Sequence, residues 1–270
     1  MSKNFELLQK LDRDRQARNG ARPGEFSHDV CESTATLDDL PRPILACERP
    51  STKIGEAIRV EISKLIHRLF LTSELTVPSS MPQHAVVFSG FEQSNGLGRV
   101  TGITSDMLAE QAPNMKVCVV DADFHNPSLH DHFGIPNGIG FTDALRDPAV
   151  TCHFTRRLTN NLWIMSCGAP SRRTNGHSQI SSETAQAVME DLRRNFDYVL
   201  ITAGNIAGSN NAIVLGHAAR GVIMVIEANC TRREIAEKYK RSFQAANVRV
   251  LGAVLHNRTF PIPQSLYALL

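Results

Sequence analysis

The segment AVVFSGFEQSNGLGRVTGITSDML, residues 85–108, decides the predicted fold. Its first six residues form a short, apolar run typical of a buried strand. A loop with Gly96 and Gly98 follows, and then a helical pattern. This order is the layout of a phosphate cradle, because loop amides and a helix N-terminus carry partial positive charge. The same turn also serves as a plain structural connection, and the glycines alone leave both interpretations open.

The loop departs from the P-loop pattern G-x-x-x-x-G-K-[ST], in which lysine reaches the phosphates and the hydroxyl binds Mg²⁺. Counting from the strand places Leu97 at the lysine and Gly98 at the hydroxyl; counting from the following strand places Arg99 and Val100 there. Arg99 can contact phosphate in place of lysine, but it cannot ligate a metal. The candidate nucleotide-binding residues of this loop are Gly96, Leu97, Gly98, Arg99 and Thr101.

Short apolar runs alternate with helical patterns from this loop to the end of the chain. The predicted strands occupy residues 85–90, 116–123, 161–167, 197–203, 221–228 and 248–255. Strands that alternate with helices predict an α/β fold with a doubly wound, mostly parallel sheet. Ligands of such sheets bind at the carboxyl ends of the strands.

Three amphipathic helices are predicted at residues 55–71, 181–196 and 231–246. In the first, the apolar stripe that should pack on the main domain consists of Ile58, Ile62, Leu65, Ile66 and Leu69. The third begins with Thr231 and Glu234, which predict a capping box.

Composition separates two regions and excludes several classes of protein. Residues 1–53 are rich in proline and polar residues, which predicts a short N-terminal helix and a flexible arm; residues 54–270 form the main domain. The net charge of +2 is too small to imply nucleic-acid binding. The chain has no run of about 18 apolar residues and no secretory signal, so we expect a cytoplasmic protein. Its six cysteines are scattered, which argues against zinc ligation and a disulfide framework.

The second strand ends in a motif that resembles a known family. The residues that carry it are Asp121, Asp123, Pro127, Ser128, Leu129, Phe133 and Gly134. This block is similar to that of the bacterial tyrosine kinases (BY-kinases) of capsule and exopolysaccharide systems, relatives of MinD/ParA-type ATPases. The resemblance implies a P-loop NTPase fold in which Asp121 and Asp123 face the γ-phosphate and Mg²⁺. His125 replaces the family's arginine. The two carboxylates can also be strand-end groups that loop amides satisfy.

The resemblance extends through residues 54–270 and loosely includes the first sixteen residues. FDYVLITAG, residues 196–204, matches the family's Walker B strand, but Thr202 replaces the metal-binding aspartate, and Gly204 and Asn205 replace a proline pair. A hydroxyl is a much poorer ligand for a hard cation than a carboxylate. ATP or ADP and Mg²⁺ are therefore expected as cofactors only if the altered site still binds them.

Two further family features concern assembly and phosphorylation. BY-kinases oligomerise through E-x-x-R-x-x-R; Glu56 and Arg59 match it, but Ile62 replaces the last arginine. Members also autophosphorylate a tyrosine-rich tail, and Tyr267 is the one tyrosine near this chain's end. The residues therefore leave homo-oligomerisation and phosphorylation open.

The absence of the P-loop lysine, its adjacent hydroxyl, the Walker B aspartate and a tyrosine-rich tail favours a catalytically inactive BY-kinase-like protein. The resemblance implies a docking or regulatory subunit for a chain-length-determinant membrane protein or another polysaccharide-export protein, located at the inner membrane through that partner. An active tyrosine autokinase, with Asp121 and Asp123 as its catalytic residues, is the first alternative; a MinD/ParA-like positioning ATPase is the second.

Other charged or apolar features have plain structural interpretations beside functional ones. His130 and His132 suggest a metal pair, but residues two apart on a helix point in different directions. Arg232 and Arg233 are either solvated or contact an acidic partner. The apolar end, residues 260–270, either packs on the core or docks to a partner.

Overall fold

The computed structural model describes residues 55–71, 84–91, 96–168, 179–206 and 210–257. These residues all belong to one compact unit, which runs from Leu37 to Leu270. The predicted N-terminal arm at 1–53 and the candidate phosphoacceptor Tyr267 lie outside the described residues.

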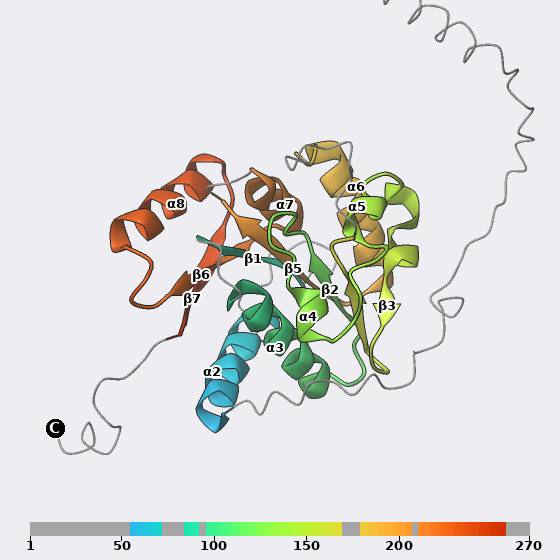
Figure 1. The fold of residues 1–270 in the computed structure, drawn as a ribbon, viewed down its shortest axis with the longest axis horizontal. Helices are drawn as coiled ribbons and strands as arrows, with labels where there is room; N and C mark the ends of the chain where they lie inside the picture. Colours follow the sequence, from blue (N-terminus) through green and yellow to red (C-terminus); the bar gives the residue numbers. More distant parts are fainter. Residues whose placement is uncertain (1–54, 72–83, 92–95, 169–178, 207–209, 258–270) are drawn as a thin grey trace, which may run out of the picture. The chain divides into compact units, whose positions relative to one another are not determined.

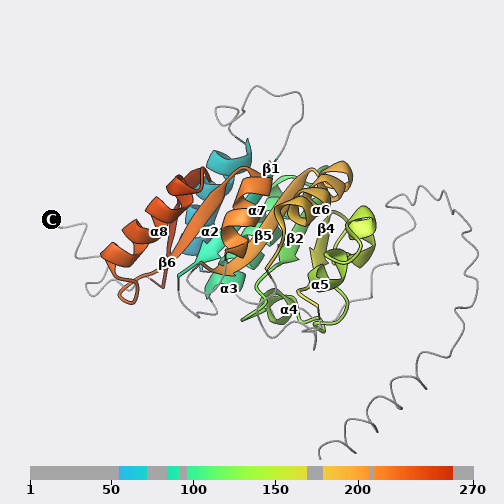
Figure 2. The same ribbon diagram turned by 90° about the horizontal axis from the view of Figure 1, so that it is seen from above.

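A sheet of seven strands forms the centre of this unit, as Figures 1 and 2 show. The strands are β1 (His84–Gly90), β2 (Val117–Asp121), β3 (Arg156–Arg157), β4 (Leu162–Met165), β5 (Tyr198–Asn205), β6 (Val222–Glu227) and β7 (Val250–His256). Their spatial order is β3-β4-β2-β5-β1-β6-β7, and all neighbours are parallel except β3 and β4. The six predicted strands are confirmed, and the two-residue antiparallel β3 is an addition that the sequence pattern did not reveal.

Helices cover both faces of the sheet, which confirms the doubly wound α/β class. The elements are α2 (Glu56–Ile66), the π-helical turn η2 (His67–Leu71), α3 (Gly96–Gln111), α4 (Leu129–His132), α5 (Phe141–Ala144), the 3-10 segment η4 (Pro148–Phe154), α6 (Ser182–Asn195), α7 (Asn211–Ala219) and α8 (Arg233–Ala245). In Figure 1, α6, α7 and α8 lie on one side of the strands, and α2 and α3 lie on the other.

Each face of the sheet has its own apolar core. On the first face, Val87, Val199 and Ile201 pack against α6, α7 and Phe243 of α8. On the second, Val119 and Leu200 pack against α2 and α3. Because side chains alternate along a strand, a strand buried on both faces needs a continuous apolar run, which is what β2 and β5 supply.

Two sequence predictions about helices are wrong. Ile58 is 45% exposed, whereas Ile62 and Ile66 are buried. The polar contacts between α2 and the end of α3 lie at Arg59 and Ser63, and the residues of α2 before Arg59, Ile58 included, are exposed.

The capping box of α8 does not form. Its N-cap residue is Arg232, and no side chain caps the helix. Thr231 instead closes the turn after β6, where its N–H donates to the carbonyl of Glu227 at 3.0 Å. The helix therefore begins too late for a Thr231–Glu234 box.

Within the described ranges, no helix combines the length and apolar character that a membrane span requires.

The contrast between Ile66 and Ile58 gives a direct test of how α2 packs. Replacing the fully buried Ile66 with alanine should cost about 2–4 kcal/mol of unfolding free energy, because it leaves a cavity in the second core. Ile58→Ala should change it by less than about 0.5 kcal/mol. Urea unfolding followed by circular dichroism measures both; equal losses would contradict the packing of α2 described above.

Candidate functional site

The sequence-predicted site residues come together at the carboxyl edge of the sheet. Asp121 is the last residue of β2 and lies in register with Thr202 of β5, which in turn lies beside Phe88 of β1. Thr202 and Asp121 share the sheet face of Leu200 and Val119, the face that α3 covers. The edge therefore brings both strand-end side chains under the N-terminal half of α3.

Asp121 is buried and its carboxylate accepts three backbone hydrogen bonds. One oxygen accepts the N–H of Asp123 at 3.2 Å; the other accepts those of Ser128 at 2.9 Å and Leu129 at 3.0 Å. Burial raises the pKa of Asp121 to about 6, and the backbone hydrogen bonds oppose that rise. The carboxylate thus holds the start of α4 against the end of β2.

Asp123 lies in the loop beyond β2 and is also occupied by backbone groups. Its Oδ1 accepts the N–H groups of His125 and Asn126, each at 3.1 Å. Gly204 lies so close that a Cβ there would stand 2.6 Å from the same oxygen, and its φ of +39° suits glycine. Gly204, at a position where the resemblance expects proline, therefore permits this close approach of β5.

The Thr202 hydroxyl is buried and has no hydrogen-bond partner among the residues that the structure describes. Such an unsatisfied group typically costs about 1–3 kcal/mol. It stands where the resemblance expects the metal-binding aspartate, beside Asp121. The Thr202 side chain supplies neither the negative charge nor the two oxygens that a carboxylate would bring to this position.

The first turn of α3 offers one exposed cation. Leu97 and Val100 are buried in the second core, while Arg99 is exposed. The nearby Thr101 hydroxyl donates to the carbonyl of Leu97 at 3.0 Å within the helix. Whichever way the loop is aligned with the P-loop pattern, one of the matched positions therefore holds an apolar side chain that is buried in the core. The Thr101 hydroxyl already donates to the helix backbone.

The glycines of α3 have a packing role. A Cβ on Gly98 would collide with the Oγ of Ser128, and one on Gly96 would collide with the imidazole of His256. Helix α3 therefore accepts the start of α4 and the end of β7 in direct contact with its backbone. These contacts supply a structural reason for the glycines that does not involve phosphate.

His256 is a site residue that sequence reasoning missed. It ends β7 in register with Glu227 of β6 and covers the N-terminal residue of α3. Burial lowers the pKa of His256; Glu227 opposes this, and Arg99 adds to it. The signal available in the sequence was only its place at the end of the last strand.

The donor set does not fit Mg²⁺ well. In proteins Mg²⁺ is usually held by one or two carboxylates together with water and phosphate oxygens. Here Asp121 is engaged by three backbone donors, Asp123 shares one oxygen with two, and Thr202 and Thr101 are neutral.

The remaining predicted residues lie away from this edge. Arg59 pairs with Glu110 of α3 at 2.9 Å, Glu56 is exposed, and Ile62 packs into the second core. His132 faces Asp106 of α3 at 3.4 Å. In the part of the chain that the structure describes, no three histidine, cysteine or acidic residues gather as a metal site would require.

Comparisons with known proteins agree with this fold and with the sequence resemblance. No family profile matches the chain. The tyrosine-protein kinase YwqD of Bacillus subtilis is 23% identical over 164 residues, 60% of this chain and 68% of the relative. The tyrosine-protein kinase CpsD of Streptococcus agalactiae is 25% identical over 166 residues, 60% of this chain and 69% of the relative.

Solved structures show a similar fold over about three quarters of the chain. The kinase domain of the Escherichia coli tyrosine kinase ETK has a TM-score of 0.62 at 15% identity, covering 76% of this chain and 79% of that one. The chimerical protein CapA2B2 has 0.58 at 19%, covering 76% and 86%. MinD from Pyrococcus horikoshii, complexed with Mg-ADP, has 0.53 at 19%, covering 70% and 77%. The chain thus has the P-loop fold of MinD and the BY-kinases, and its sequence is homologous to the capsule-type tyrosine kinases.

The buried Thr202 hydroxyl predicts that its removal raises the stability of the protein. Thr202→Val removes a buried hydroxyl that has no partner among the described residues while keeping the side-chain shape, so it should raise the unfolding free energy by about 1 kcal/mol. Thr101→Val is the matched control: it removes a paired hydroxyl and should cost up to about 1 kcal/mol. Thermal unfolding distinguishes the two, and a loss in both variants would show that Thr202 has a partner in solution.

Asp121 predicts a pH dependence of stability. Its pKa is higher in the folded protein, about 6, than in the unfolded chain, about 4, so the folded state holds the proton more tightly. This contribution is fully present below about pH 4 and is lost as the pH rises to about 6, a fall of about 3 kcal/mol. Denaturant unfolding across this range should show the fall, and Asp121→Asn should remove it. A slope that persists in Asp121→Asn would refute the assignment to this carboxyl.

Proposed function

We propose that this chain is a BY-kinase-like protein without phosphoryl-transfer activity, which acts as a docking or regulatory subunit in polysaccharide export. The observation that carries the proposal is the buried Thr202 hydroxyl, which has no partner among the described residues and stands where the family resemblance expects a metal-binding carboxylate. Sequence homology with the capsule-type tyrosine kinases supports the biological context.

Phosphoryl transfer depends on positioning and on neutralising the charge of the phosphates, chiefly by a metal ion and a cation in the loop. Removing a single electrostatic contact from an active site typically costs about 10²–10³ in rate. Here the metal-binding hydroxyl, the loop lysine and the Walker B aspartate are all replaced. Arg99 restores one cation but no metal ligand.

We propose a membrane protein of the chain-length-determinant type as the partner, with this chain on its cytoplasmic side. The family resemblance implies such a protein, either fused or separate. That a structural neighbour is a chimera, CapA2B2, supports a two-component arrangement. In this arrangement the P-loop fold serves as a binding module.

An active tyrosine autokinase is the second candidate. The curated relatives are themselves tyrosine-protein kinases, and Arg99 is exposed on the first turn of α3, where it can reach a phosphate. This alternative requires Asp123, whose second oxygen has no backbone donor among the described residues, to hold the metal. It also requires an acceptor tyrosine such as Tyr267.

Calorimetric titration with ATP and with ADP, each with and without Mg²⁺, tests the proposal. We expect no magnesium-dependent binding in the micromolar range. Micromolar, magnesium-dependent binding that Asp123→Asn abolishes would overturn it, because that result would give the carboxylate a metal-binding role. Radiolabelled ATP provides a second measurement: incorporation into the wild type that Tyr267→Phe removes would establish the autokinase instead.

A further inference from the structure

Positive charge is concentrated on α8, although the whole chain is nearly neutral. The chain has 29 basic and 27 acidic residues. The cations of α8 and its N-cap are Arg232, Arg233, Lys238, Lys240 and Arg241, and the anions are Glu234 and Glu237; all seven are exposed. A helix whose outer face is this basic attracts anionic partners.

Several of these cations are not neutralised within the protein. Glu237 serves two of them, since it pairs with Arg233 at 2.9 Å and with Arg241 at 4.0 Å. Among the described residues, Lys238 and Lys240 have no ion-pair partner. The helix therefore presents more positive charge than its own carboxylates can balance.

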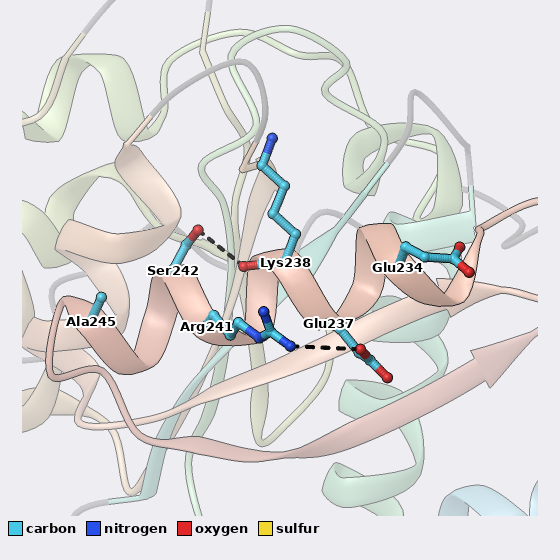
Figure 3. A pocket seen from close by; sticks show the side chains of 6 residues that line it. All are labelled: Glu234, Glu237, Lys238, Arg241, Ser242 and Ala245. Atoms are coloured by element: carbon cyan, nitrogen blue, oxygen red, sulfur yellow. Dashed lines mark hydrogen bonds and ion pairs between the residues drawn. The ribbon is translucent and has the colours of Figure 1, made fainter.

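A depression of about 530 Å³ runs along this helix, lined by Glu234, Glu237, Lys238, Arg241, Ser242 and Ala245. In Figure 3, Lys238 extends away from the Arg241–Glu237 pair, and the short side chains of Ser242 and Ala245 lie toward the end of the helix away from Glu234. The Ser242 hydroxyl donates to the Lys238 carbonyl at 3.2 Å and is thereby held on the helix. The surface thus combines cations with a recess that can receive small side chains.

The inner face of α8 fixes this surface in place. Phe243 is fully buried in the first core, and the Tyr239 ring lies 5.2 Å from that of Phe91, at the end of β1. No large apolar side chain of α8 is among the strongly exposed ones. Membrane-surface helices insert such residues among the lipids, so this composition favours a peptide over a bilayer.

We infer that the outer face of α8 docks an acidic, extended peptide segment of a partner protein. Carboxylates of the segment pair with Lys238 and Arg241, and its small residues occupy the recess above Ser242 and Ala245. The inference rests on the proposed docking role and names the chemistry of the partner. The surface lies on the sheet face opposite to Thr202 and Asp121, so it can be altered without changing the carboxyl-edge site.

Fluorescence anisotropy with a labelled peptide of alternating Glu and Ser tests this inference on the full chain. We expect binding that weakens between about 50 mM and about 300 mM salt, since exposed charges are screened. Lys238→Glu with Arg241→Glu should weaken it about tenfold, as two exposed ion pairs become repulsive. Lys64→Glu with Arg68→Glu, which reverses two exposed cations near α2, is the matched control and should change it less than about twofold.

Three outcomes would overturn the inference: no peptide binding at low salt, equal losses in both double variants, or binding of phosphatidylserine vesicles or duplex DNA in place of the peptide. If the charge reversal unfolds the protein, Lys238→Gln with Arg241→Gln replaces it in the anisotropy measurement, because this variant removes the two cations without adding repulsion. The nucleotide titration is independent of this surface. Magnesium-dependent nucleotide binding would refute the inactive-kinase proposal, whereas peptide failure alone would refute only the α8 surface.

Discussion

The arrangement of the carboxyl edge depends on the hydrogen bonds that Asp121 accepts from Ser128 and Leu129. A carboxylate buried at a strand end is costly unless donors surround it, and the turn into α4 supplies them. These two hydrogen bonds hold the loop that contains Asp123, and this loop places Ser128 against Gly98 of α3. One buried acid therefore links β2, α4 and the glycine-bearing helix into a single unit.

This linkage shows which contacts hold the carboxyl edge of the sheet together. The parts that shape the edge remain, namely parallel strands, the glycine-bearing helix and the strand-end acids. Several polar groups of the edge are engaged within the protein: both strand-end acids accept hydrogen bonds from loop amides, and the Thr101 hydroxyl donates to its own helix. The Thr202 hydroxyl has no such partner among the described residues, at the position where the resemblance expects an aspartate. The fold is thereby maintained by packing and backbone hydrogen bonds.

The sequence predicted the six longer strands and the sheet class, because buried parallel strands leave unmistakable apolar runs. It also placed both Asp121 and Thr202 among the candidate nucleotide-binding residues, and the structure puts them in register on neighbouring strands. It did not predict β3, which has too few residues for a periodic signal, or the exposure of Ile58, which depends on where α3 ends. The sequence also did not predict which way the Asp121 carboxylate points or that His256 lies over Gly96. Both features are set by contacts between distant segments.

The short antiparallel β3 has a consequence for association between molecules. An open sheet edge invites pairing with another chain unless the edge is short or charged. On this side the last strand has two residues, both arginines, and the guanidinium of Arg157 lies 5.3 Å from the centre of the Trp163 ring. That side is consequently a poor template for strand addition. Of the two edge strands that the structure describes, β7 is longer than β3. An added strand from another molecule would therefore pair with β7 and not with β3.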